Sequence, residues 1–298
     1  MNLKVWCVFI SLFLIPISLF GNQNIEVGLV NWSRDLDEAY SKSHSTGKPV
    51  LVLFQEVPGC SGCKTFGRDV LSHPLLVEAI ENEFHPVLVY NNRSGADEKL
   101  LKKFKEPAWN YQVLRFLDAK GEDIIPRKDK VWSLEAVVKR MMEALTKVDR
   151  QVPNYLKTLL AEVNFDKYEK VAFSMYCFWT GEMKLGGLEG VIGTEAGWLE
   201  GHEVTLVTYD KSILQLNNLI DRAKELKCAN EVFTSNRDLI KNYRKAKASD
   251  QKKQLSRLKT IPNLTKMQAS KMNAYVTVSM PKALEWLSPK QKSYLLSH

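Results

Sequence analysis

The stretch PVLVLFQEVPGCSGCKTF, residues 49–66, decides the fold of the first half of the chain. It opens with an uninterrupted apolar run, VLVLF (50–54), which is typical of a buried strand. Two cysteines separated by two residues, Cys60 and Cys63, follow where a helix over 61–71 is predicted to begin. A buried strand that leads into a Cys-x-x-Cys pair at a helix start indicates an α/β fold with sulfur chemistry at that point.

The sequence on both sides of this stretch alternates between helices and strands. The predicted helices cover residues 31–48, 61–71, 74–82, 96–105 and 133–145, and the predicted strands cover 49–54, 84–92 and 111–122. Ser33 is the expected cap of the first helix, and Ser72 that of the helix beginning at Pro74. This order predicts an α/β domain over 22–150 with helices on both faces of its sheet. The charged stretch 146–154 is the predicted linker.

The second half of the chain has a different order of predicted strands and helices. Its predicted strands cover residues 170–179, 190–198 and 202–210. A helix is predicted over 212–226 because apolar residues recur at helical spacing, at Ile213, Leu216, Leu219, Ile220 and Leu226. Strands followed by a run of helices predict an α+β domain over 151–298.

The chain from residue 231 onward is lysine-rich and predicted to be mostly helical, in short pieces ended by Pro262, Pro281 and Pro289. Its densest basic stretch, 241–253, is typical of a solvated helix face. The net charge of +8 is dispersed, and the lysines lack a series of interleaved aromatics that could stack on bases. A nucleic-acid partner is therefore not expected.

The N-terminus is predicted to carry a targeting signal. Residues 5–20 are continuously apolar, which is too short for a membrane span and right for the core of a signal peptide. We expect a signal peptide over 1–21 and a periplasmic or secreted protein, with Cys7 removed on cleavage. The alternative is an uncleaved anchor, which would be the chain's contact with a membrane.

The remaining cysteines and the histidines limit the kinds of site. Four cysteines in roughly 275 exported residues are too few for a disulfide-built scaffold: Cys60, Cys63, Cys177 and Cys228. The histidines lie scattered along the chain, without the paired spacing of zinc ligands. We therefore expect neither a metal nor an organic cofactor.

The residues alone allow three interpretations of the cysteine pair. In a redox pair, helix amides stabilise the Cys60 thiolate, Lys64 adds positive charge, and Cys63 lies one turn inside, close enough to resolve a mixed disulfide. A zinc site would need a second pair, and Cys177 and Cys228 are too far apart in sequence to supply it. The redox pair is the favoured interpretation; an inert disulfide and a metal site are the alternatives.

The first half resembles a known family. Residues 30–147, from NWSRDLDEAYSKSHSTGKPVLVLF through CSGCKTF to VLRFLDAKGE, are similar to secreted thioredoxin-fold domains. VPGC (57–60) resembles a thioredoxin-like group in which selenocysteine or cysteine occupies the position of Cys60. The resemblance implies that Cys60 is the nucleophile and Cys63 the resolving thiol.

One position departs from that family. Thioredoxin-fold proteins have a cis-proline just before the strand that begins here at Val113, whereas this chain has Gln112 there and its nearest proline is Pro107. A cis bond before a residue other than proline costs about 2.5–4 kcal/mol. We therefore expect a trans or reshaped loop, and altered binding of partner proteins.

A second stretch, FSMYCFWTGE (173–182), sets a cysteine in an aromatic context. From composition alone, Cys177 is typical of a buried core cysteine. The longer segment resembles methionine sulfoxide reductase A over residues 170–228. The family's GCFW matches Cys177 to Trp179, its Gly-Tyr-x-Gly-Gly segment loosely matches Gly197-Trp198, and its GHAEVVxVTYD matches Gly201 to Asp210 with one residue deleted.

This second resemblance implies roles for several residues. Cys177 would attack the sulfoxide sulfur, Glu203 would hydrogen-bond or protonate the sulfoxide oxygen, and Cys228 is the candidate resolving thiol. The substrate's methyl group would bind in an apolar cup formed by Phe178 and Trp179, with Trp198 beside it. The alternatives are an exposed strand glutamate for Glu203 and a loop or core cysteine for Cys228.

The second half also departs from its family. Tyr176 replaces the glycine before the nucleophile and is expected to crowd the site. Trp198 stands where a tyrosine hydroxyl is expected, and the family's later Asp-x-Gly-Thr-Gln-Tyr-Arg-Ser segment has no counterpart. These differences leave open a degenerate domain that has kept its fold and lost efficient catalysis.

These observations leave three possible functions, all of which assume an exported protein that carries cysteine thiols. The first is reduction of oxidised methionine in peptides or proteins at Cys177, with Cys60 and Cys63 passing electrons from an external thiol reductant. The second is reduction or isomerisation of disulfides in exported proteins by Cys60 and Cys63 alone. The third is a non-enzymatic binding protein whose cysteines form static bridges.

Overall fold

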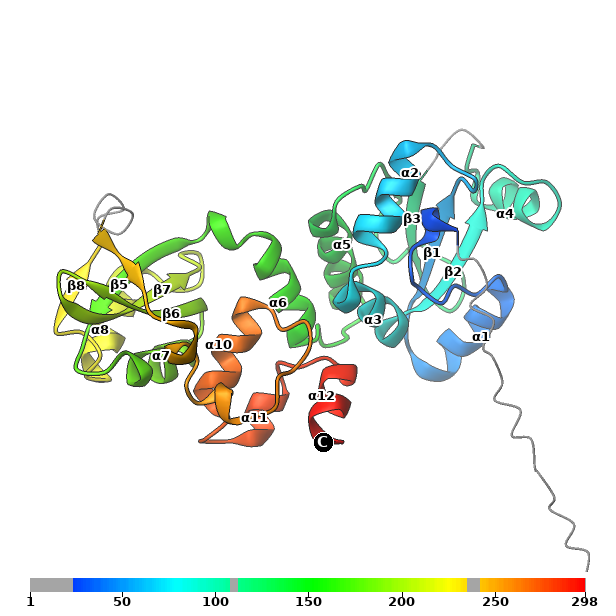
Figure 1. The fold of residues 1–298 in the computed structure, drawn as a ribbon. Helices are drawn as coiled ribbons and strands as arrows, with labels where there is room; N and C mark the ends of the chain where they lie inside the picture. The colour runs from blue at the N-terminus through cyan, green and yellow to red at the C-terminus, as the bar shows by residue number, and fades with distance from the viewer. Residues whose placement is uncertain (1–23, 108–111, 235–241, 298) are drawn as a thin grey trace, which may run out of the picture.

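A computed structural model describes residues 24–107, 112–234 and 242–297 (Figure 1). The predicted signal peptide over 1–21, with Cys7, lies outside these residues. Within the described ranges no helix combines the length and the apolar composition needed to cross a membrane. The two halves of the chain build two separate sheets.

The first sheet has four strands in the order β2-β1-β3-β4. β1 (Val50–Gln55) pairs in parallel with β2 (His85–Tyr90) and antiparallel with β3 (Gln112–Leu117), and the short β4 (Lys128–Asp129) pairs with β3. Every residue of β1 is buried, as its apolar run predicts. β4 was not predicted from the sequence.

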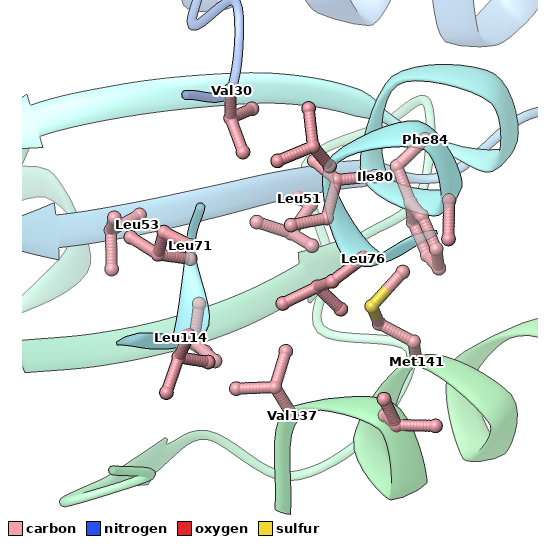
Figure 2. Close-up of a cluster of buried hydrophobic side chains, with 14 of the residues drawn as sticks. Val30, Leu51, Leu53, Leu71, Leu76, Ile80, Phe84, Leu114, Val137 and Met141 are labelled. Carbon is pink, nitrogen blue, oxygen red and sulfur yellow. The ribbon is translucent and has the colours of Figure 1, made fainter. Parts of the chain in front are cut away.

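Helices cover both faces of this sheet, as predicted. They are α1 (Leu36–Thr46), α2 (Ser61–Thr65) continued by the π-helical turn η2 (Phe66–Val70), α3 (Pro74–Glu83), α4 (Ala96–Phe104) and α5 (Leu134–Lys147). Val50, Val52 and Phe54 form one core with α1 and α4. Leu51 and Leu53 point to the other face and belong to the core formed with α3 and α5; Figure 2 shows Leu51 near Leu76 and Ile80 of α3, and Leu53 beside Leu71.

Both predicted helix caps are wrong. The side chain of Asp35 caps α1 by accepting a hydrogen bond from the Glu38 backbone N–H, because the backbone of Ser33 is engaged beside β2. α3 follows His73 without a side-chain cap, and the Ser72 hydroxyl donates to the carbonyl of Gly67 instead. Ser33 is thus taken by a tertiary contact with β2, and Ser72 by a hydrogen bond to the preceding turn.

The second sheet has five antiparallel strands in the order β8-β5-β7-β6-β9. They are β5 (Glu169–Ser174), β6 (Val191–Leu199), β7 (His202–Tyr209), β8 (Glu231–Phe233) and β9 (Arg244–Lys245). α7 (Phe178–Gly186) follows β5, and α8 (Leu216–Glu225) follows β7, so the first six elements run β-α-β-β-α-β. α7 and α8 pack on one face of the sheet.

The region after residue 226 departs from its prediction in three ways. β8 and β9 are strands within a stretch predicted to be helical, and residues 242–253 are not a continuous solvated helix. Pro281 and Pro289 lie at the starts of α11 (Met280–Leu284) and α12 (Pro289–Leu296) rather than at helix ends. The long helix here is α10 (Lys266–Tyr275). Before this region, Ile213 was predicted to lie on the apolar face of the helix over 212–226. It precedes α8 instead, and its side chain is exposed.

One helix, α6 (Asn154–Val163), contacts both domains. It begins at the end of the predicted linker and packs against α3 and α5 of the first domain and α10 of the second. Tyr155, Leu156 and Leu159 of α6 belong to the core of the first domain. At its far end, Glu162 accepts a hydrogen bond from the Lys266 backbone N–H. α6 therefore belongs to the core of the first domain and also contacts the second domain.

Candidate redox sites

Cys60 and Cys63 lie together where β1 leads into α2. Cys60 is the N-cap residue of α2, and its Sγ is 3.3 Å from the Sγ of Cys63. Both thiols are free in this structure; Cys60 is exposed, whereas Cys63 is buried. One sulfur can therefore meet a partner molecule while the other lies behind it, within reach of the first.

The two sulfurs differ in acidity. Hydrogen bonds lower the pKa of the Cys60 thiol below its usual range, above all the bond from the backbone N–H of Cys63, followed by that from the Cys63 side chain. Burial raises the pKa of Cys63 to about 12, and its hydrogen bond to Cys60 adds to this effect. This is the asymmetry expected of an attacking and a resolving thiol.

The loop before the pair is held by a residue that the sequence did not reveal. The buried carboxylate of Glu26 accepts a hydrogen bond from the Gly59 backbone N–H at 3.0 Å, and the Gln55 side chain donates to the Glu26 carbonyl. Gly59 packs so closely on Cys63 that a Cβ would lie 3.1 Å from its Sγ. Glu26 precedes the pair by more than thirty residues, in a stretch without a recognisable pattern.

A metal ion could also bind at this pair. Ligand atoms of Glu56, Cys60 and Cys63 all lie within 4.8 Å of one another. Two thiolates and a carboxylate would suit a thiophilic cation such as zinc. The sequence did not predict the contribution of Glu56.

Gln112, at the expected cis-proline position, is the first residue of β3 and is buried beside Gln55. Its side-chain amide donates to the carbonyl of Val131. Residues 108–111, on which the expectation of a trans or reshaped loop depends, lie outside the described residues. The cis peptide bond described in this domain joins Val57 to Pro58, on the other side of the pair.

Cys177 occupies a similar backbone position in the second domain. It follows β5 as the N-cap residue of α7 and is half-buried. Glu203 of β7 lies beside it, because one carboxylate oxygen accepts a hydrogen bond from the Phe178 backbone N–H at 2.9 Å. The structure thus brings together the predicted cysteine and glutamate across two elements.

The predicted aromatic residues gather at the same place. The Phe178 ring is in edge contact with Trp179 and Trp198, with centroids 5.9 Å and 5.7 Å apart. Trp198 is partly exposed, so one side of this cluster is open to solvent. Tyr176 was expected to crowd the site, but its side chain is 97% exposed, so the expectation is wrong.

Cys228 is not brought to this site. It is fully buried in the core formed by β5, α7 and α8, and its thiol contacts the Leu226 carbonyl at 3.5 Å. Burial raises its pKa. No hydrogen bond or disulfide among the described residues joins it to Cys177. As the structure stands, Cys228 packs as a core cysteine.

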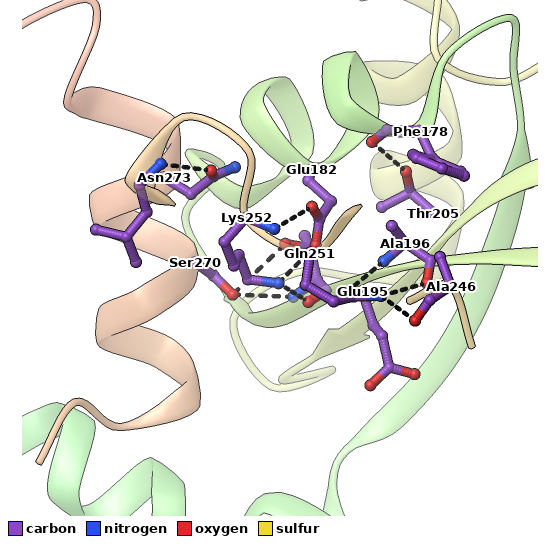
Figure 3. A network of polar contacts seen from close by, with 12 residues as sticks. Phe178, Glu182, Glu195, Ala196, Thr205, Ala246, Gln251, Lys252, Ser270 and Asn273 are labelled. Atoms are coloured by element: carbon purple, nitrogen blue, oxygen red, sulfur yellow. Dashed lines mark hydrogen bonds and ion pairs between the residues drawn. The ribbon is translucent and has the colours of Figure 1, made fainter. Parts of the chain in front are cut away.

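A polar network supports α7, and the sequence did not predict it. Glu182 is completely buried and binds Lys252 twice, through the backbone N–H at 2.7 Å and the ammonium at 2.6 Å (Figure 3). The neighbouring Gln251 accepts from the Ala196 N–H and donates to its carbonyl. We call residues 248–253 the strap, because they tie α7 to β6.

The comparisons with known proteins bear on the first domain. Residues 31–118 match a family model described as thioredoxin-like. The N-terminal half has a thioredoxin-like α/β fold. A mixed α/β domain follows it. A solved structure titled "DsbH Oxidoreductase" aligns with 43% of this chain and 92% of its own, at 20% identity and a TM-score of 0.34, too low to support an argument.

No curated protein matches the chain. The predicted thioredoxin-like fold is thus confirmed for the first half. The family match ends at residue 118, so the resemblance of the second half to methionine sulfoxide reductase A stays a prediction.

Proposed function

We propose that this protein is a thiol–disulfide oxidoreductase that acts on exported proteins through Cys60 and Cys63. The observation that carries the proposal is the exposed Cys60 sulfur, with its lowered pKa, 3.3 Å from a buried thiol. The thioredoxin-like fold of residues 31–118 agrees with this chemistry. A disulfide with a purely structural role does not require that one of its cysteines be exposed and have a lowered pKa.

The reaction follows from the two acidities. The Cys60 thiolate attacks a substrate disulfide, forms a mixed disulfide and releases the first substrate thiolate. Cys63 then loses its proton and attacks the Cys60 sulfur, which releases the second substrate thiolate and leaves a Cys60–Cys63 disulfide. Two electrons have passed to the substrate, and an external dithiol must return them. The raised pKa of Cys63 keeps it from competing in the first step.

The test is insulin reduction by the mature chain with dithiothreitol as the electron source. We expect activity in the wild-type protein and in Cys177→Ser, and none in Cys60→Ser. Incubation in millimolar glutathione provides an independent measurement. A Cys60–Cys63 disulfide that resists reduction there, together with no insulin reduction, would support static bridges in a binding protein instead.

A second activity is favoured by the surroundings of Cys177. We infer that this site reduces methionine sulfoxide, because a carboxylate and an aromatic cluster flank the cysteine. The carboxylate of Glu203, in β7, binds the backbone N–H of Phe178, the residue after Cys177, and the open cluster of Phe178, Trp179 and Trp198 could hold a thioether methyl group.

The proposed chemistry uses these groups in two steps. The sulfur of Cys177 attacks the sulfoxide sulfur while a proton reaches the sulfoxide oxygen through Glu203, which yields methionine and a sulfenic acid on Cys177. A second thiol then displaces water and forms a disulfide. Cys228 could act only after leaving the core, so the Cys60–Cys63 pair or an external thiol is the better candidate.

The assay for this activity uses a peptide that contains the S-epimer of methionine sulfoxide, with dithiothreitol as reductant. We expect Cys177→Ser to abolish turnover and Cys60→Ser to leave it unchanged, because dithiothreitol replaces the pair. Turnover that survives Cys177→Ser would remove this cysteine from the mechanism. A wild-type protein without turnover would indicate a degenerate domain.

A further inference from the structure

The second sheet has a cavity on the face opposite α7 and Cys177. Side chains alternate between the two faces along a strand. Phe173 and Val207 point into the core beneath α7, so Lys170, Leu206 and Thr208 point the other way. These residues form the floor of a cavity of about 260 Å³. Neither the cysteines nor Glu203 line this cavity, although Gln251 and Lys252 of the strap do.

One wall of this cavity is an aromatic ring. Phe165 belongs to η3 (Phe165–Lys167), and its ring lies over Gly193 of β6, where a Cβ would come within 2.9 Å of it. Glycine at this position is what lets the ring approach the sheet. The ammonium of Lys266 is 4.0 Å from the ring centroid, and that of Lys170 is 5.9 Å from it. Two cations therefore flank one flat apolar wall.

The cavity lining carries more positive than negative side chains. Its lining contains four lysines, Lys170, Lys245, Lys252 and Lys266, but a single acidic residue, Glu195. Glu195 is bound by Lys245, and Lys252 is bound by the buried Glu182. Lys266 reaches Glu162 at 3.4 Å, and its side chain is 55% exposed. Within the described ranges Lys170 forms no ion pair, although it is half-buried.

We propose that this cavity binds a small aromatic monoanion, a carboxylate or sulfonate on a flat apolar body. The anion would lie between Lys170 and Lys266, where positive charge exceeds negative charge. The flat body would pack beside the Phe165 ring and over Leu206 and Thr208. A volume of about 260 Å³ is slightly smaller than that of ordinary ligand pockets, about 300–1,000 Å³, and suits a small body of one or two fused rings.

The first test needs no variant. Isothermal titration of the full chain with naphthalene-2-sulfonate should give saturable binding at one site. The neutral naphthalene-2-sulfonamide has the same rings, and we expect its affinity to be lower by about tenfold or more, the effect of one hydrogen bond to a charged group. Absence of saturable binding, or equal affinity for the two probes, would overturn the proposal.

The second test locates the site. Lys170→Gln removes the unpaired cation and should weaken sulfonate binding by about tenfold. Lys211→Gln is the matched control, because Lys211 is an exposed lysine of the same domain that pairs with Glu169 outside the cavity. Circular dichroism verifies that both variants are folded. Equal affinities in the two variants would place the anion elsewhere and refute this assignment.

Discussion

The two cysteine sites share a backbone position and differ in their neighbours. Cys60 and Cys177 each follow a strand, adopt an extended conformation and precede the first residue of a helix. Beside Cys60 lies a second thiol at 3.3 Å, whereas beside Cys177 lies the Glu203 carboxylate, bound to the next backbone amide. A helix start can expose a reactive sulfur in either fold, but the neighbouring group decides which reaction can follow.

The supports of the two sites differ as well. The Cys60 loop is held by Glu26 from the chain segment that precedes the first strand. The helix after Cys177 is held from the opposite direction in sequence, by Lys252 of the strap. Each site can therefore be disturbed without touching the other, and the predictions below use this independence.

The largest effect should come from removing the resolving thiol of the first site. Cys63→Ser leaves Cys60 able to attack but leaves no neighbouring thiol of the protein to release the mixed disulfide, so release depends on slow attack by the external reductant. We expect insulin reduction to fall about a thousandfold or more, as for loss of a residue that acts as part of a catalytic unit. Non-reducing electrophoresis should show the trapped complex. A variant that turns over normally would show that Cys63 is not the resolving thiol.

The next largest effect concerns the strap. Lys252→Met leaves the buried Glu182 carboxylate without its cation, and breaking one partner of a buried pair costs about 3–5 kcal/mol. Chemical denaturation should show this loss of unfolding free energy. Lys247→Met, at an exposed lysine close by in sequence, serves as the control. A loss below 1 kcal/mol, on the order of a surface pair, would contradict the buried role of Lys252.

A smaller effect should follow from changing the carboxylate of the second site. Glu203→Gln keeps the shape and can still accept from the Phe178 N–H, but it has no acidic proton. We expect sulfoxide reduction to fall about a hundredfold, within the range of general acid catalysis, with insulin reduction unchanged. If both activities fell together, the two sites would not be independent.

The smallest effect is a difference in alkylation between the paired thiols. Because its pKa is lowered, Cys60 should react with iodoacetamide at a rate that levels off at a lower pH than for free cysteine. Cys63, whose pKa is raised to about 12, should be labelled at least about tenfold more slowly than Cys60 at pH 8. Peptide mass spectrometry gives both rates in one sample. In urea the two rates should become equal.

Strong local patterns made most of the fold predictable. The apolar run of β1 and the amphipathic α5 were placed to within about two residues, because burial on one or both faces dictates their composition. β4, β8 and β9 were missed, since strands of two or three polar residues carry no periodicity. Their pairing is set by the longer strands beside them.

The candidate sites were predictable only where their residues are adjacent in sequence. The two helix-start cysteines were found because strand, cysteine and helix are adjacent in sequence. Glu26 and Lys252 were not found, because each reaches its site through a contact across 33 or 70 residues. A lysine in a basic run is typical of a solvated surface, and nothing local marks the one that meets a buried carboxylate.

The shared helix α6 has a consequence for the supply of electrons. Figure 1 shows α2 and α7 in domains on either side of α6, and α6 packs into both. Because α6 packs against both domains, we expect them to keep this arrangement rather than to move as if joined by a flexible tether. If the first pair then re-reduces Cys177 in another copy, turnover per molecule should rise in proportion to protein concentration.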